Sequence, residues 1–307
     1  MTRTMPPEIE QDLARARRLE WVTLGTMSTV LVLMFLAAGS SQAMRTAWFE
    51  DVLSLVPALV FLIAAKVERR QPSRAFPYGF HRVQSLAFLI SAVTLASVGG
   101  FLLFDSASTL IKGEHVTIAP VTLFGQTLWL GWVMIAALVY SVIPPLILGR
   151  LKLPVAQRLQ DKVLHTDALM QKADWMTGLA GIVGVLGVGL GFWWADATAS
   201  MFIAASIVRD GVSALRSSTA ELIDGAPRKL EKDEIAADAE ELRRRLAGRY
   251  PDAQIRLRET GRFFNAQVRG VLPENQVDLD ELWPAGEDRP WRLAQVSFIP
   301  PGADQES

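Results

Sequence analysis

The sequence contains no cysteine and only three histidines, His81, His115 and His165. Without cysteine, the chain forms no disulfide, has no thiolate metal ligand and uses no cysteine nucleophile. Three scattered imidazoles also argue against a zinc site built mainly from histidine. We find no nucleophile–base constellation, no phosphate-binding glycine loop after a strand, and no basic stripe with interleaved aromatic residues. We therefore expect no enzyme activity, no cofactor and no nucleic-acid partner.

Charged residues are scarce in the middle of the chain and gather near its end. Of 307 residues, 50% are hydrophobic and 21% are charged, and the net charge is −1. This mixture predicts one apolar part and one charged part. We expect a polar cytoplasmic N-terminal segment at 1–20, a six-helix transmembrane domain at 21–225 and a cytoplasmic domain at 226–307. The N-terminal segment has no signal-peptide pattern.

Six apolar runs predict transmembrane helices. They are residues 21–38, 48–65, 83–104, 121–148, 176–195 and 197–215. The last run reaches spanning length only by continuing through Arg209 and Asp210. Lysine and arginine are concentrated at 66–82 and 150–165, which we interpret as loops. Because positive residues stay inside, we expect both termini to be cytoplasmic, in an integral protein of a bacterial cytoplasmic membrane.

The fifth run is preceded by two carboxylates on one face. Asp167 and Asp174 are seven residues apart, so they lie on the same side of a helix. Counted from Leu164, Asp174 lies about 15 Å along that helix, deep in a hydrocarbon core of about 30 Å. An ionised aspartate there costs about 2.5–3.5 kcal/mol. A proton, a lysine or a bound cation has to offset this cost, and Lys172 points to the opposite face.

The second run offers an acidic partner at Glu50 and Asp51. Asp51 lies about 22 Å above the cytoplasmic end of its helix, so it reaches nearly the height of Asp174. Carboxylate oxygens suit divalent cations, and two carboxylates in a dry site take up a proton when the cation leaves. We therefore predict a site for metal–proton exchange between these helices. The candidate metal ligands are Asp51, Asp174, Glu50, Ser54, Met170 and Gln171.

Structural roles for these residues remain open alternatives. Asp174 could pair with a residue on another helix and only hold the helices together. Ser54 and Gln171 each lie one turn from a carboxylate, and core packing explains them about as well as metal binding. Met170 fits packing better than coordination.

The charged C-terminal segment predicts a small α+β (ferredoxin-like) domain. The expected order is a helix at 230–249, strands at 254–258 and 263–272, a short helix at 278–283 and a strand at 291–299. About 80 residues make a domain of marginal stability on its own.

Taken together, these features resemble the cation diffusion facilitators. Four stretches carry the resemblance: 76–87 before the third run, 167–174 before a glycine-rich helix, 193–197 at the turn into the sixth run, and 217–224 at the join to the tail. The resemblance covers nearly the whole chain. It implies a proton-coupled antiporter, usually a homodimer, that exports a divalent cation such as zinc, manganese, iron or cobalt as its substrate.

The family's intramembrane site takes two residues from the fifth span, four positions apart. Here these positions are Met170 and Asp174, and the earlier one is commonly His or Asp in the family. The loss of this ligand motivates an alternative function, a non-transporting partner or regulator of another exporter. A carboxylate-rich site favours harder ions such as manganese or magnesium.

The second span contributes the other two residues, also four positions apart. The best register gives Asp51 and Leu55, and a shift by one residue gives Glu50 and Ser54. The sequence leaves this choice open.

Overall fold

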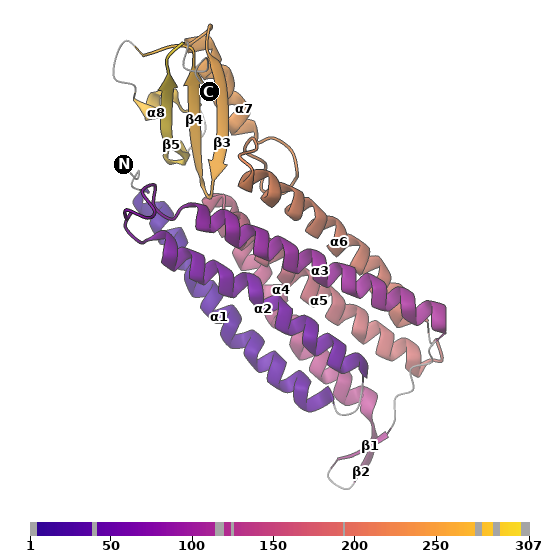
Figure 1. Ribbon diagram of the computed structural model, residues 1–307. Coiled ribbons are helices and arrows are strands. Elements are labelled where there is room, and N and C mark those ends of the chain that lie inside the picture. The colour runs from indigo at the N-terminus through magenta and orange to yellow at the C-terminus, as the bar shows by residue number, and fades with distance from the viewer. Residues whose placement is uncertain are drawn as a thin grey trace.

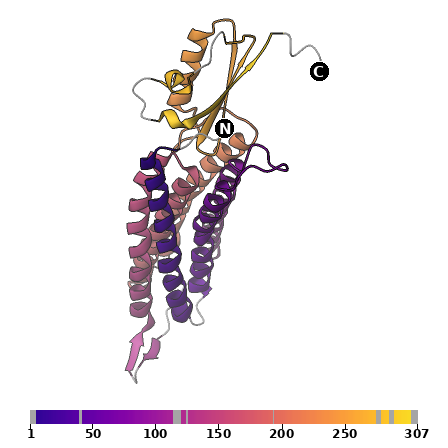
Figure 2. The same ribbon diagram turned by 90° about the vertical axis from the view of Figure 1, so that its left-hand side faces the viewer.

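The computed structural model describes residues 5–38, 42–113, 120–123, 126–192, 194–273, 278–284 and 289–301. Within these ranges, long helices form an elongated bundle with a small sheet domain at one end and a hairpin at the other (Figures 1 and 2). The bundle helices are α1 (Pro7–Ala38), α2 (Gln42–Glu68), α3 (Arg82–Lys112), α4 (Leu130–Leu159), α5 (Lys162–Gly189) and α6 (Ala195–Leu222).

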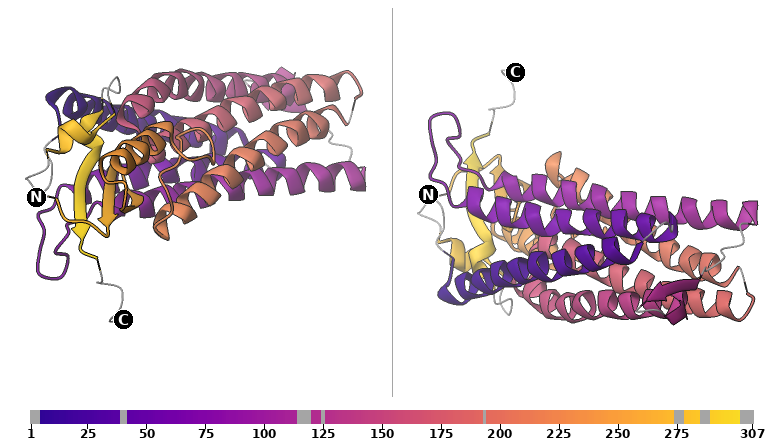
Figure 3. Two further views of the ribbon diagram at one scale, coloured as in Figure 1. Left: turned by 90° about the horizontal axis from the view of Figure 1, so that it is seen from above. Right: turned by 90° about the horizontal axis from the view of Figure 1, so that it is seen from below.

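Helix α5 is the central helix of the bundle. It contacts α2, α3, α4 and α6, and the views from above and from below in Figure 3 show the bundle helices running alongside one another. Its glycines permit close approach to α4, as the glycine-rich sequence suggests. A Cβ added at Gly178 would lie 2.6 Å from Cγ2 of Val142, and one at Gly181 would lie 3.3 Å from Leu138. The polar side chains of Asp167, Gln171 and Asp174 on α5 are therefore surrounded by protein.

Three helices among the described residues are long and apolar enough to cross a membrane. They cover Pro7–Leu36, Arg82–Lys112 and Gly131–Leu159, in α1, α3 and α4. Helices α2, α5 and α6 pack alongside them (Figure 1) and carry charged residues within their length. The expectation of six spans remains a prediction for these three helices.

The predicted fourth run differs from the observed structure at both ends. Its first residues form strands β1 (Pro120–Leu123) and β2 (Gln126–Trp129), which pair antiparallel. Threonine and valine favour strands there, and the remaining residues still suffice for a span. Helix α4 then continues through three prolines to Leu159, so the predicted loop at 150–165 is wrong. Packing against α1 and α5 supports the helix where proline removes a backbone hydrogen bond.

The tail domain has the predicted order of helices and strands. It contains α7 (Ala237–Arg249), β3 (Gln254–Thr260), β4 (Phe263–Arg269), α8 (Leu279–Leu282), a 3-10 turn (Pro290–Arg292) and β5 (Leu293–Ile299). Strand β4 lies in the centre of the sheet, antiparallel to β3 and parallel to β5.

The first tail helix starts seven residues later than predicted. Residues 230–236 are not helical, because the Lys229 N–H donates to the Glu234 carbonyl and Arg228 forms a β-bridge with Ile235. The predicted last strand likewise begins with a 3-10 turn. Apolar residues of α7 and β4, including Leu242 and Phe264, form the tail core.

Candidate functional site

The carboxylate of Asp174 meets helix α2 inside the bundle. Ser54 Oγ donates a hydrogen bond of 2.8 Å to Asp174 Oδ1. Ser54 is fully buried and Asp174 is 6% exposed. Counted from Lys162, where α5 begins, Asp174 lies about 18 Å along the helix. This distance along α5 is close to the predicted one, and the hydrogen bond joins two helices that are far apart in the chain.

Asp51 lies one turn before Ser54 on α2, about 4.5 Å away along the axis. The residue is half-buried, and its Oδ2 atom has no hydrogen-bond partner among the described residues. The side chain of Glu50 lies outside the described residues. Asp51 therefore lies near the Ser54–Asp174 pair and has an unused buried oxygen.

Ser54, and not Leu55, contacts Asp174. Leu55 packs against an apolar cluster that includes Met27 of α1 and Met134 of α4. The rotation of α2 about its axis thus places Ser54 opposite α5. Ser54 is the second residue of the alternative pair, Glu50 and Ser54. This geometry favours the register that the sequence presented as second best.

Met170 and Gln171 lie on different sides of α5. Met170 is fully buried in an apolar cluster with residues of α3 and α6, including Leu95 and Ile207. Gln171 is fully buried against α4, where a Cβ added at Gly149 would lie 3.3 Å from its Cβ. Neither amide atom of Gln171 has a hydrogen-bond partner in the part of the chain that the structure describes.

Lys172 points away from Asp174, as predicted. Its Nζ lies 3.4 Å from Asp210 Oδ2 on α6. Asp210, one of the two charged residues late in the sixth run, is therefore paired with a helix of the bundle. Lys172 is therefore not the partner that offsets the buried charge of Asp174.

The described residues contain no group of three or more His, Asp or Glu side chains arranged to hold a metal ion. The candidate site is instead a mixed oxygen site of carboxylates and a hydroxyl. Oxygen ligands of this kind suit hard divalent cations, and water completes their coordination. The arrangement can bind a cation or, when the cation has left, a proton.

The sequence pattern does not reveal a buried ion-pair cluster in the half of the bundle that lies nearer the tail domain. Lys152 of α4 binds Glu20 of α1 at 2.8 Å and also binds Asp167 of α5. The sequence places Asp167 on a polar helix face, but it predicts a loop at Lys152 and a polar N-terminal segment at Glu20. The only sequence feature that points to this cluster is Asp167 itself, because a carboxylate on a buried helix face requires a basic partner.

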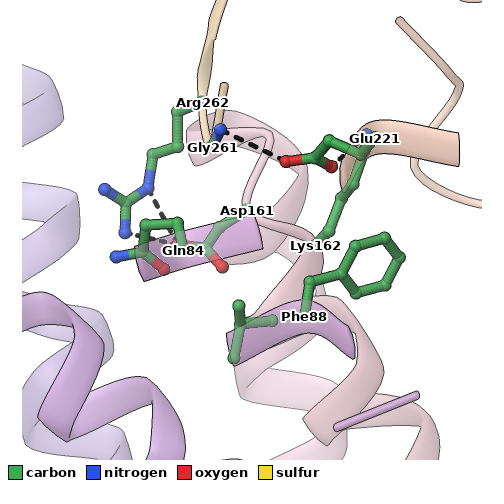
Figure 4. Close-up of a pocket in the computed structure, with 8 residues that line it drawn as sticks. Gln84, Phe88, Asp161, Lys162, Glu221, Gly261 and Arg262 are labelled. Carbon is green, nitrogen blue, oxygen red and sulfur yellow. Dashed lines mark hydrogen bonds and ion pairs between the residues drawn. The ribbon is translucent and has the colours of Figure 1, made fainter. Parts of the chain in front are cut away.

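A second polar region joins the bundle to the tail, at the turn between β3 and β4 (Figure 4). Arg262 Nη2 lies 2.5 Å from Asp161 Oδ2, before α5, and Nη1 lies 2.7 Å from Glu68 Oε2, at the end of α2. The backbone N–H of Gly261 donates to Glu221 of α6 at 3.2 Å. One tail turn is thus bonded to three helix ends.

Glu68 is ionised in this junction despite its burial. Burial raises the pKa of its carboxyl, but the charge of Arg262, the nearby imidazole of His81 and hydrogen bonds from Gln84 and Arg262 outweigh that effect. The pKa of Glu68 is therefore lowered from 4.5 to about 2. Glu68 lies beyond the apolar run of α2, so it titrates from the aqueous side.

Acidification is expected to weaken the junction. Because the folded-state pKa of Glu68 is below its ordinary value, its contribution to stability is complete above pH 4.5 and is lost as the pH falls toward about 2. That contribution is roughly 3 kcal/mol. Thermal unfolding of the wild type and Glu68→Gln, compared across this range, should converge at low pH. A constant difference in midpoint between the two proteins would contradict the assignment.

Comparison with known proteins points to one family. Residues 21–223 match the model of the cation efflux transmembrane domain. A probable cation efflux system protein of Mycobacterium tuberculosis is 27% identical over 216 residues, which cover 69% of this chain and 60% of that protein. The manganese efflux system protein of Bacillus subtilis is 20% identical over 185 residues, 60% of each chain.

A further relative is a probable proton-coupled zinc antiporter of Bos taurus. It is 26% identical over 113 residues, 34% of this chain and 26% of that protein. The chain spans 60% of the length of the bacterial relatives. The matched region contains the Ser54–Asp174 pair, Lys152 and Asp167, whereas Glu20 lies one residue before it.

Proposed function

Because the chain belongs to the cation efflux family, a family of membrane transporters, we propose that it exports a divalent metal cation in exchange for protons. The observation that carries this proposal is the hydrogen bond between Ser54 and Asp174, buried between α2 and α5. It supplies oxygen ligands from two helices at a depth where a bound cation offsets the cost of the carboxylate.

Asp174 is the principal ligand in this proposal. Its carboxylate binds the cation from α5, while Ser54 and Asp51 contribute oxygens from α2, and Glu50 and Gln171 are further candidates. When the cation leaves, the carboxylates take up protons, because two charges in one dry site repel each other. Alternation between these states couples outward cation movement to inward proton movement.

The cation class follows from the ligand chemistry. Hydroxyl and carboxylate oxygens without a nearby imidazole favour harder ions, so we rank manganese above zinc. The Bacillus subtilis relative is named for manganese efflux, and the cattle relative for zinc. Six spans, cytoplasmic termini and assembly as a homodimer in a bacterial cytoplasmic membrane complete the proposal.

A second candidate function is that of a non-transporting partner or regulator of another exporter. The position of Met170 favours it, because this side chain packs with α3 and α6 where the family commonly has a ligand. The site then holds fewer ligands than an exporter of this family normally uses.

Transport by the purified protein in proteoliposomes separates the two functions. Manganese, zinc, iron, cobalt and magnesium are offered one at a time, and cation entry and internal pH are recorded together. An exporter moves at least one of these cations with opposite proton movement, and manganese is expected to move fastest. Absence of cation movement, together with no heat of binding in calorimetry, would leave the partner function.

A further inference from the structure

The bundle contains a second buried acidic site, separate from the Ser54–Asp174 pair. Lys152 Nζ lies 2.8 Å from Glu20 Oε2 and also contacts Asp167 Oδ2. All three side chains are fully buried, and they come from α4, α1 and α5. We call Glu20, Lys152 and Asp167 the buried triad.

The charges of the buried triad do not balance. Two carboxylates share one ammonium group, so the triad carries one surplus negative charge when both are ionised. No other described lysine or arginine pairs with either carboxylate. A surplus charge without solvent is costly, and one bound proton removes it.

Each carboxylate also has an unused oxygen. Glu20 Oε1 and Asp167 Oδ1 are buried and lack a hydrogen-bond partner within the described ranges. A buried carboxylate oxygen that accepts no hydrogen bond raises the free energy of the folded protein. Protonation of either oxygen supplies a donor where none exists and lowers the charge to zero.

Within the described parts of the neighbouring helices, no lysine or arginine other than Lys152 compensates the surplus charge. On α2, which packs against α1 and α5, Lys66 and Asp51 are the ionisable groups nearest to the apolar part of the helix, and neither pairs with the triad. Asp161, which precedes α5, is close enough to act on Glu20. Its own charge is already paired with Arg262.

Gln171 lies between the buried triad and Asp174 on one face of α5. It follows Asp167 by four residues and precedes Asp174 by three. Its amide is fully buried, with a donor and an acceptor that no described residue uses. Such a group can orient water molecules along this face by hydrogen bonding, and a chain of water molecules can carry a proton to either side while the amide itself stays unchanged.

We propose that the buried triad is a proton-binding site, and that protons travel between it and the cation site along the Asp167–Gln171–Asp174 face of α5. In the bound state, one carboxylate of the triad is a neutral acid and Lys152 remains an ammonium ion. Release returns the proton and restores the surplus charge. The proposal rests on the proposed proton exchange but places one of its protons away from the cation ligands.

Glu20→Gln tests the proposal, because glutamine keeps the shape and still accepts a hydrogen bond from Lys152. The variant leaves one carboxylate for one ammonium group, so no proton is needed. Infrared difference spectra of the wild type minus the variant, recorded on purified protein above about pH 6, where exposed carboxylates are ionised, should show a protonated carboxyl band, because the bands of Asp51 and Asp174 are common to both proteins and cancel. In proteoliposomes, the variant should move fewer protons per cation.

Asp167→Asn is a second variant that removes the same surplus from the other side and should lose the same band. Asp210→Asn is the matched control, because Asp210 has a one-to-one partner in Lys172, and it should keep the band. A band that persists in both triad variants overturns the proposal. A wild type with the band but without cation transport would instead contradict the proposed function alone.

Discussion

Asp174→Asn is expected to abolish cation-dependent proton movement in proteoliposomes. Asparagine keeps the volume and still accepts the hydrogen bond from Ser54, so the bundle should fold as before. The charge that binds the cation is lost, and so is the group that takes up a proton. Residues that only orient a ligand lower affinity roughly 10–100-fold when changed. Removal of the ligand itself should exceed that range.

Two further variants sharpen this result. Ser54→Ala removes the hydroxyl but keeps the Asp174 charge, so it should lower cation affinity about tenfold and keep proton coupling. Asp210→Asn changes a carboxylate of α6 that faces Lys172 and not α2, so transport should persist. If Asp174→Asn moves every tested cation as fast as the wild type, the site is misassigned.

Arg262→Met is expected to destabilise the join between tail and bundle by about 3–5 kcal/mol. The side chain is 2% exposed and pairs with Glu68 and Asp161. Methionine fills much of the same volume but leaves two buried carboxylates without their guanidinium. Such uncompensated charge, and not lost packing, is the main cost. Thermal unfolding followed by near-ultraviolet circular dichroism measures the change.

A double variant identifies the cause of this loss. The double variant Arg262→Met, Glu68→Gln also removes the buried negative charge of Glu68. Part of the lost stability should therefore return. Arg243→Ala is the control, because its pair with Glu240 on α7 is exposed and should not alter the unfolding midpoint. Equal losses in the single and double variants would show that charge at Glu68 plays no part in the junction.

Hydrophobic patterning accounts for most of the fold that could be predicted. The long apolar runs became helices, and the alternating segments of the tail became strands in the expected order. These features depend on local sequence period, which burial on one face makes visible. The helix ends were less predictable, since α4 continues through Pro154 and α7 starts only at Ala237.

The depth of Asp174 and the shared face with Asp167 followed from counting residues along one helix. The partners of these side chains did not, because helical period says which face a residue occupies but not what that face meets. Glu20 and Lys152 are 132 residues apart, and their meeting depends on how α1 packs against α4.

The rotation of α2 is the clearest case of this limit. A turn of one residue, about 100°, exchanges Leu55 for Ser54 opposite Asp174, and both choices satisfy the sequence pattern. Packing of Leu55 with apolar residues of α1 and α4 sets that rotation. The amino-acid order thus determined that a carboxylate enters the membrane domain on α5, whereas contacts among distant helices determined which oxygens surround it.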